Sequence, residues 1–198
     1  YYSWTYISIT NVLLLPAVIG GFIVAIITIR KKEWAPITVP IYGVLQGIFL
    51  GIISNVFNAM YDGIVITAIS YTLCILFALL SVYRLGLIKP TENFKLGLAA
   101  ATGGIAIVYL ANFIMSFFGS GIPLMDINNS SMYSIGFSVF VIVIASMNLV
   151  VDFDFIEEGA EKGAPKYMEW YGAFGLMVTL VWLYLEILKL LAKMNSRK

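Results

Sequence analysis

The chain has 198 residues, of which 61% are hydrophobic and only 12% charged, and its formal net charge is +1. A soluble domain has about twice that charged fraction, and a nearly neutral chain gives no electrostatic reason to expect nucleic acid as a partner. The sequence has no histidine and a single cysteine, Cys74. These two facts exclude a disulfide framework and a histidine-based catalytic triad.

The apolar residues fall in runs that are long enough to cross a bilayer, for which a helix needs roughly 20 residues. A membrane β-barrel would instead show short alternating segments, which this sequence lacks. We therefore predict an all-α integral membrane protein whose residues 1–198 form one polytopic domain. Its six expected transmembrane helices lie at about residues 13–29, 37–60, 64–83, 96–118, 132–151 and 167–191. The first is placed after the aromatic start of the chain because Pro16 suits the beginning of a helix.

The basic residues indicate which connectors face the cytoplasm. The connectors after the first, third and fifth expected helices contain lysine and arginine, whereas those after the second and fourth contain none. By the positive-inside rule the first set is expected to be cytoplasmic. The set comprises Arg30, Lys31, Lys32, Arg84, Lys89, Lys95, Lys162 and Lys166. The basic tail breaks this pattern, because six crossings place Lys189, Lys193, Arg197 and Lys198 on the opposite side unless the last segment is re-entrant.

Three glycines in the second expected helix, Gly43, Gly47 and Gly51, are spaced four residues apart on one face. Small residues at this spacing allow two helix backbones to approach closely, which favours tight packing inside the bundle. A dimer face and a pore-lining stripe remain open as alternatives.

Two aspartates, Asp152 and Asp154, stand where the fifth apolar run ends. Asp152 shares a helical face with Asn148, four residues earlier, whereas Asp154 points in roughly the opposite direction. We therefore assign Asp152 to the bundle interior and Asp154 to the rim. A charge inside a membrane is costly, so Asp152 is a candidate proton-sensing group and the sole candidate metal ligand. The alternative is that both aspartates mark the cytoplasmic end of a helix.

Glu186 lies near the end of the last expected helix, roughly 25 Å along the axis from Glu169. It precedes Lys189 by three residues, so an interfacial ion pair and an acidic group at a pore mouth are both open. The sequence contains no GxSxG, P-loop or HExxH motif, and we expect neither enzymatic activity nor a cofactor.

The segment NLVVDFDFIEEGAEKGAPKYMEWYGAFGLMVTLVWLYLEILKLL closely resembles the bacterial branch of the Bax inhibitor-1 (YccA-like) family, as do WAPITVPIYGVLQGIFLGIIS and AATGGIAIVYL. The resemblance implies a seven-helix bundle with a central final helix, of which these six helices would be the last six. It also implies a bacterial cytoplasmic (inner) membrane location. Family members resemble pH-sensitive calcium leak channels with one aspartate in each of the last two helices. Asp152 matches the first aspartate, and Met177 stands where the second is expected.

From this resemblance we expect a pH-sensitive cation leak channel, with Ca²⁺ as the transported ion and not as a cofactor. Arg30 or Lys32 is the candidate counter-charge. The candidate proton-sensing and ion-pathway residues are Asn148, Asp152, Asp154 and Glu186. The alternative is a non-conducting partner or modulator of the membrane protease FtsH, or an accessory subunit of a larger membrane complex, with the lipid bilayer as surroundings in either case.

Overall fold

Six long α-helices make up most of the computed structural model, which describes residues 2–119, 121–127 and 129–196, with side chains from Val12 onward. Two short 3-10 helices, η1 (Lys32–Trp34) and η2 (Pro123–Met125), lie in connectors. The long helices are α1 (Tyr2–Arg30), α2 (Ala35–Met60), α3 (Ile64–Arg84), α4 (Glu92–Phe117), α5 (Met132–Glu161) and α6 (Tyr167–Asn195).

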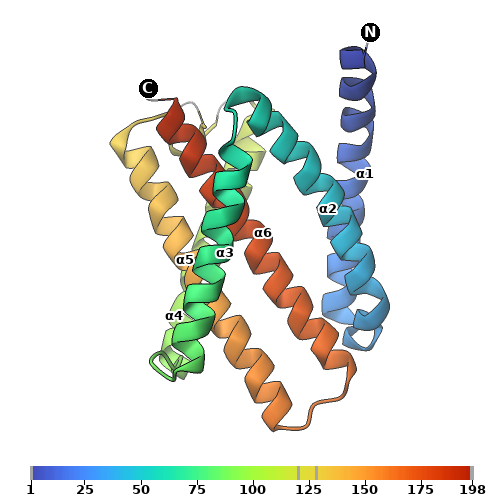
Figure 1. Ribbon diagram of the computed structural model, residues 1–198, viewed down its shortest axis with the longest axis vertical. Helices are drawn as coiled ribbons and strands as arrows, with labels where there is room; N and C mark the ends of the chain where they lie inside the picture. Colours follow the sequence, from blue (N-terminus) through green and yellow to red (C-terminus); the bar gives the residue numbers. More distant parts are fainter. Residues whose placement is uncertain (1, 120, 128, 197–198) are drawn as a thin grey trace.

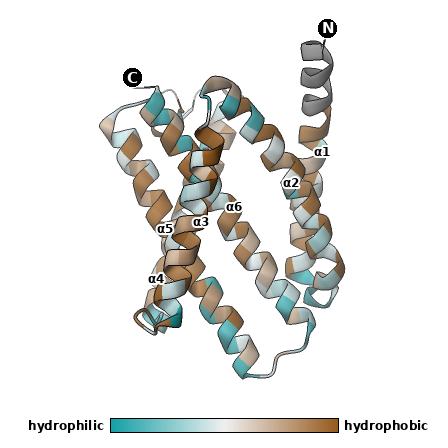
Figure 2. Ribbon diagram, in the orientation of Figure 1, coloured by the Kyte–Doolittle hydropathy of each residue, from teal (hydrophilic) through white to brown (hydrophobic). Residues whose placement is uncertain are grey.

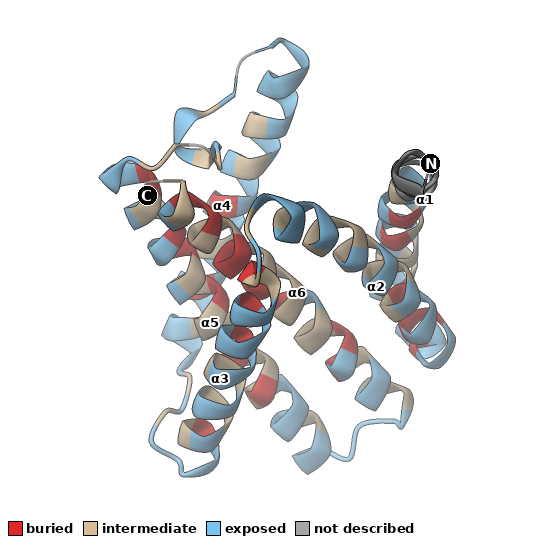
Figure 3. Ribbon diagram, turned by 45° about the horizontal axis from the view of Figure 1, so that its top comes forward, coloured by how far each residue is buried: buried red, intermediate tan, exposed pale blue. Residues whose placement is uncertain are grey.

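The helices run alternately up and down, so that the three basic connectors α1–α2, α3–α4 and α5–α6 lie at one end of the bundle (Figure 1). Helix α6 packs against α2, α3 and α5 and is the central helix. Its Leu183 and Leu188 are fully buried together with Leu149 of α5. Figure 3 shows the buried residues along these facing surfaces. The expectation of a central final helix is therefore confirmed.

The outer surface of the bundle is apolar. All six α-helices are long and apolar enough to span a membrane within the part of the chain that the structure describes. Figure 2 shows hydrophobic residues along the length of the helices. Large hydrophobic side chains such as Phe22, Ile66 and Ile107 are exposed. Outward apolar side chains belong in lipid and not in water. The prediction of an all-α integral membrane protein is confirmed.

Helix α5 continues to Glu161, well past the predicted end near residue 151. The prediction ended the helix where charge appears, but glutamate is a good helix former and charge alone does not break a helix. The break comes at Gly163, whose φ of 63° is left-handed. Asp152 and Asp154 therefore lie inside a helix and do not mark its C-terminus.

Three other helix ends lie well outside the predicted ranges, whereas α2 ends at Met60 and α3 begins at Ile64 as predicted. Helix α1 begins at Tyr2 and contains Pro16 in its interior, a position that helices in a bundle within a membrane tolerate. Helix α4 begins at Glu92 because the Thr91 side chain caps it, accepting from the Phe94 N–H at 3.3 Å. Helix α6 is continuous to Asn195, so the last segment is not re-entrant.

Candidate functional site

Asp152 is half-buried on α5 and faces the central helix α6. A Cβ placed on Gly175 would lie 3.4 Å from Asp152 Oδ1, so the absence of a side chain at Gly175 leaves space for the carboxyl group. The carboxyl group also interacts with the Thr179 side chain one turn further along α6. Its second oxygen, Oδ2, is buried and has no hydrogen-bond partner among the described residues. A buried oxygen of this kind is costly when it carries charge.

Asp154 points away from α6, toward α3 and α4. One carboxylate oxygen forms a salt bridge with Lys95 Nζ of α4 at 2.6 Å, and the other accepts from the Tyr83 hydroxyl of α3 at 3.4 Å. Tyr83 also donates to Glu157. The Asp154 side chain is only 23% exposed, so this rim group is paired with protein and not fully hydrated.

Asn148 lies on α5 one turn before Asp152 but serves a different contact. Its Nδ2 donates to Thr102 Oγ1 of α4 and to the Ile144 carbonyl, both at 2.9 Å. Asn148 therefore links α5 to α4, while Asp152 faces α6.

The structure does not bring the candidate counter-charges to Asp152. Lys32 Nζ lies 4.9 Å above the Tyr171 ring, and Arg30 lines a separate cavity at the α1–α2 connector. No ion pair links either cation to Asp152 within the described ranges. The counter-charge role of Arg30 or Lys32 stays a prediction, and the direct contact of Asp152 is with α6.

Met177, the residue expected opposite Asp152, points toward α2. A Cβ on Gly43 would lie 3.5 Å from Met177 Cε. Residues two apart on a helix point in nearly opposite directions, so Met177 lies on the other side of α6 from Gly175 and Thr179. The α6 positions that face Asp152 are 175 and 179, and neither carries an acidic side chain.

Glu186 is a buried carboxylate at the far end of α6 from the basic connectors, and one of its oxygens accepts two hydrogen bonds. The Tyr109 hydroxyl of α4 donates to its Oε1 at 2.7 Å, and Lys189 Nζ donates to the same oxygen at 2.9 Å. Glu186 itself is 2% exposed. The expected ion pair with Lys189 is present, but the carboxylate lies inside the bundle and not at its surface.

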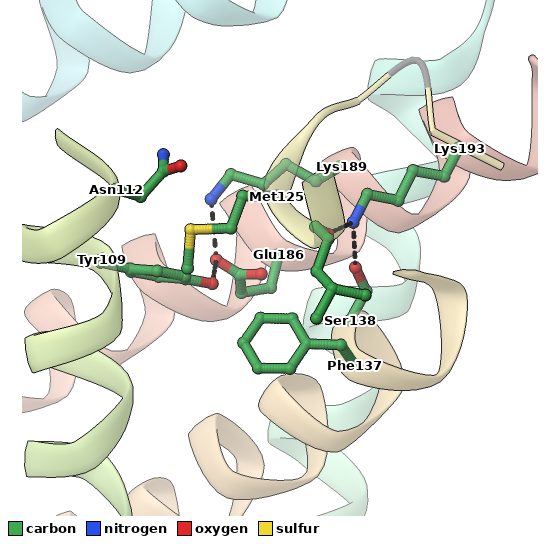
Figure 4. Close-up of a pocket in the computed structure, with 9 residues that line it drawn as sticks. Tyr109, Asn112, Met125, Phe137, Ser138, Glu186, Lys189 and Lys193 are labelled. Carbon is green, nitrogen blue, oxygen red and sulfur yellow. Dashed lines mark hydrogen bonds and ion pairs between the residues drawn. The ribbon is translucent and has the colours of Figure 1, made fainter. Parts of the chain in front are cut away.

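Lys193 is buried beside this group, although the sequence suggests only a basic tail. Its ammonium donates to the Leu124 carbonyl at 2.8 Å, to Ser138 Oγ at 2.9 Å and to the Ser134 carbonyl at 3.4 Å. Together with Glu186 and Lys189 it lines a polar cavity of about 220 Å³ (Figure 4). Of the four tail cations, Lys193 is buried and Lys189 is paired with Glu186, whereas Arg197 and Lys198 lie outside the described residues.

One face of α6 connects the two acidic groups. Gly175, Thr179, Glu186 and Lys193 are spaced by four or seven residues, which places them on the same side of a helix. Asp152 lies against the first two and the polar cavity against the last two. Glu186 follows Thr179 by about 10 Å along the axis at 1.5 Å per residue.

The three α2 glycines do not form one packed stripe. Gly43 packs against Met177, but a Cβ on Gly47 or Gly51 would meet no atom within 4 Å. The prediction of tight internal packing is wrong for these two positions. Helix α2 still contacts α6 in its second half, where Ser54 Oγ and the Tyr184 hydroxyl are 2.6 Å apart. Gly51 there lines an open apolar groove between α2, α3 and α6.

Several residues of the site were missed by sequence reasoning. Tyr109, Thr179 and Lys95 each lie on a different helix from the acid they contact, and neither a polar nor a basic residue in a helix indicates its partner on another helix. Lys193 gave a weak signal, since it continues the helical face of Glu186. Within the described residues no three acidic, cysteine or histidine side chains gather as a metal site.

The fold and this buried polar face define a polytopic helical membrane protein with ionisable groups around its central helix. A family model described as Bax inhibitor 1 like matches residues 1–196. The chain belongs to the Bax inhibitor-1-like family. Searches of curated proteins and of solved structures returned no match.

Proposed function

We propose that this protein is a pH-sensitive cation leak channel in which Ca²⁺ is the transported ion and Asp152 is the proton-sensing group. The observation that carries the proposal is the buried Oδ2 of Asp152, which has no hydrogen-bond partner in the described part of the chain. Taking up a proton removes the charge from this oxygen, and losing it restores the charge. The two protonation states therefore differ in how well they fit the present α5–α6 contact.

The acids closest to Asp152 along α5 are already occupied. Asp154 is bound to Lys95, and Glu157 accepts from Tyr83. Both contacts join α5 to the outer helices α3 and α4. Asp152 alone of the three faces the central helix, so its charge acts on the contact around which the bundle is built. A change in charge there biases the equilibrium between two helix arrangements.

In this proposal the ion path has the Asp152 contact at one end and the polar cavity around Glu186 at the other. The cavity is lined by carboxylate, hydroxyl and amide oxygens as well as by Lys189 and Lys193. Oxygen ligands suit Ca²⁺. The common α6 face of Thr179 and Glu186 supports a single path along that helix, with the Asp152 contact at one end and the cavity at the other.

We place the basic connectors on the cytoplasmic side of a bacterial inner membrane. The proposal rests on the positive-inside rule and is supported by the common location of all three basic connectors at one end of the bundle (Figure 1). Accessibility of a single cysteine introduced at Lys89 or at Asp62, in a Cys74→Ser background, tests it. Labelling from the periplasmic side at Asp62 alone is expected, and labelling at Lys89 alone would reverse the assignment.

The test of conduction is Ca²⁺ flux into liposomes that contain the purified protein, measured from pH 5 to pH 8. Wild type is expected to change its flux with pH, and Asp152→Asn to lose that dependence because the amide cannot titrate. Asp154→Asn is the matched control, since it removes an acid two residues away that faces other helices. Equal pH dependence in wild type and Asp152→Asn, or no flux in either, would overturn the proposal.

A second candidate function is a non-conducting partner of a membrane protease such as FtsH or of another membrane complex. The open face at Gly47 and Gly51 favours it, because glycines without a neighbour leave a helix backbone accessible to another helix. Gly47→Leu with Gly51→Leu is expected to abolish co-purification of such a partner in mild detergent while leaving the fold intact. A stoichiometric partner in the absence of ion flux would favour this function over conduction.

A further inference from the structure

A second polar cavity, of about 510 Å³, lies at the end of the bundle where the α1–α2 connector meets the start of α6. It is lined by Arg30, Lys31, Lys32, Glu33, Trp34 and Tyr167. Three consecutive cations and the acid Glu33 therefore lie beside Tyr167, an aromatic residue of the last helix. None of these residues takes part in the Asp152 contact or in the cavity around Glu186.

The cations of this cavity are held by aromatic rings and not by carboxylates. Lys31 Nζ lies 4.4 Å above the Trp34 ring, and Lys32 Nζ lies 4.9 Å above the Tyr171 ring. Across the described ranges, no ion pair involves Arg30 or either lysine. Cation–π contacts orient an ammonium without neutralising it, so the positive charge of the cavity stays available to an anion.

The position of the cavity matches the headgroup region of a bilayer. Its residues lie where the span Val12–Arg30 ends and the span Lys32–Met60 begins. The span Tyr167–Asn195 begins at the same place. Tryptophan and tyrosine such as Trp34 and Tyr167 are enriched at this depth.

We propose that this cavity binds the phosphate group of an anionic phospholipid. Phosphate oxygens accept hydrogen bonds from ammonium and guanidinium groups, and the acyl chains would lie along the exposed apolar faces of α1 and α2. The positive group of a zwitterionic headgroup would be repelled by the three cations of the cavity. The site therefore selects lipids whose headgroups carry a net negative charge. This proposal is independent of ion conduction.

The experiment counts lipids bound to the purified full chain in neutral detergent micelles by native mass spectrometry. Phosphatidylglycerol, phosphatidylcholine and inorganic phosphate are titrated in separate arms. The variant is Lys31→Gln with Lys32→Gln. The matched control is Arg84→Gln with Lys89→Gln, which removes the same charge from the α3–α4 connector, where both cations are exposed and line no cavity described here.

Wild type is expected to bind one phosphatidylglycerol in preference to phosphatidylcholine. The Lys31/Lys32 variant should lose about 30-fold in affinity, which corresponds to roughly 1 kcal/mol for each cation near a membrane surface. The control should stay within about twofold of wild type, because it leaves the cavity intact. Equal losses in both variants, or no preference between the two lipids in wild type, would overturn the proposal. Displacement of the lipid by millimolar inorganic phosphate would assign the site to free phosphate instead and overturn the lipid assignment.

Discussion

Asp152 and Glu186 are two acids against the same face of the central helix, yet their surroundings differ. Glu186 accepts from a tyrosine of α4 and from Lys189, and it is buried with both partners in place. Asp152 has an interaction with Thr179 and a buried oxygen without a partner. A buried acid that is paired with a cation and bonded to a second helix holds helices together, whereas a buried oxygen without a partner is more stable when its charge is removed.

This difference separates a structural acid, Glu186 of α6, from a switching acid, Asp152 of α5. The Glu186 contacts join α6 to α4 and, through Lys193, to the connector that contains η2. The Asp152 contact joins α6 to α5 with fewer bonds. Removing the side chain is therefore expected to damage the fold at Glu186 and to alter function at Asp152. The following predictions test that contrast in order of decreasing effect.

The largest loss of stability is expected for Glu186→Ala. The substitution leaves the Tyr109 hydroxyl without its acceptor and Lys189 without its ion-pair partner. We expect a loss of about 3 kcal/mol in the free energy of unfolding, as for other buried pairs broken on one side. Glu186→Gln keeps an acceptor for Tyr109 and should lose much less. Unfolding of both variants in mixed micelles measures this, and an Ala variant as stable as wild type would remove Glu186 from its structural role.

The second largest effect is expected at the close approach of α5 and α6 near Asp152. A Cβ on Gly172 would lie 2.8 Å from Ile156 Cγ1, so Gly172→Ala should cost about 2 kcal/mol through overpacking. Gly47→Ala is the matched control, since it adds the same methyl group where nothing lies within 4 Å. Ile156→Ala combined with Gly172→Ala should recover part of the loss. Equal stability of the two glycine variants would show that the α5–α6 contact is looser than described.

A smaller effect is expected for the second aspartate. Asp154→Asn breaks a 2.6 Å salt bridge whose side chains are 23% and 25% exposed. Water screens such a pair, so the loss of stability should be about 1 kcal/mol or less. A double-mutant cycle with Lys95→Gln isolates the pair. A coupling energy above about 2 kcal/mol would place this bridge among the buried contacts that hold the bundle together.

The smallest change in stability is expected at the switching acid itself. Asp152→Asn exchanges a partly unpaired carboxyl group for a neutral amide of the same shape, so the free energy of unfolding at pH 7 should be unchanged or slightly higher. Thermal unfolding in detergent at pH 7 checks this. A loss as large as that of Glu186→Ala would mean that both acids are structural and would remove the contrast between them.

Much of this architecture follows from the sequence, because the length of apolar runs and the spacing of charges depend on local geometry alone. The six spans and the opposite directions of Asp152 and Asp154 follow from helix periodicity. The extension of α5 past residue 151 could not be predicted in this way. The predicted helix ended where charged residues begin, because charge is costly in a membrane, whereas α5 itself ends just before Gly163. The helix continues because glutamate has a high helix propensity, which a hydropathy scale does not measure.

The contacts between helices could not be predicted, since they depend on how distant segments dock. The ammonium of Lys193 reaches the carbonyl of Leu124 across the bundle, and no pattern in either segment indicates the other. The same limit explains the glycine stripe of α2. Spacing placed Gly43, Gly47 and Gly51 on one face, but only the docking of the helices decides that Gly43 packs against Met177 and the other two meet no atom within 4 Å.

The measurement that tests the central claim most directly is infrared difference spectroscopy of the protein in lipid bilayers between acidic and neutral pH. If Asp152 takes up a proton as the flux changes, a carboxylic C=O band should appear on acidification over the same pH range. The band should be absent from Asp152→Asn and retained in Asp154→Asn. A band that survives in Asp152→Asn, or the absence of any such band in wild type while its flux still responds to pH, would contradict the assignment of Asp152 as the proton-sensing group.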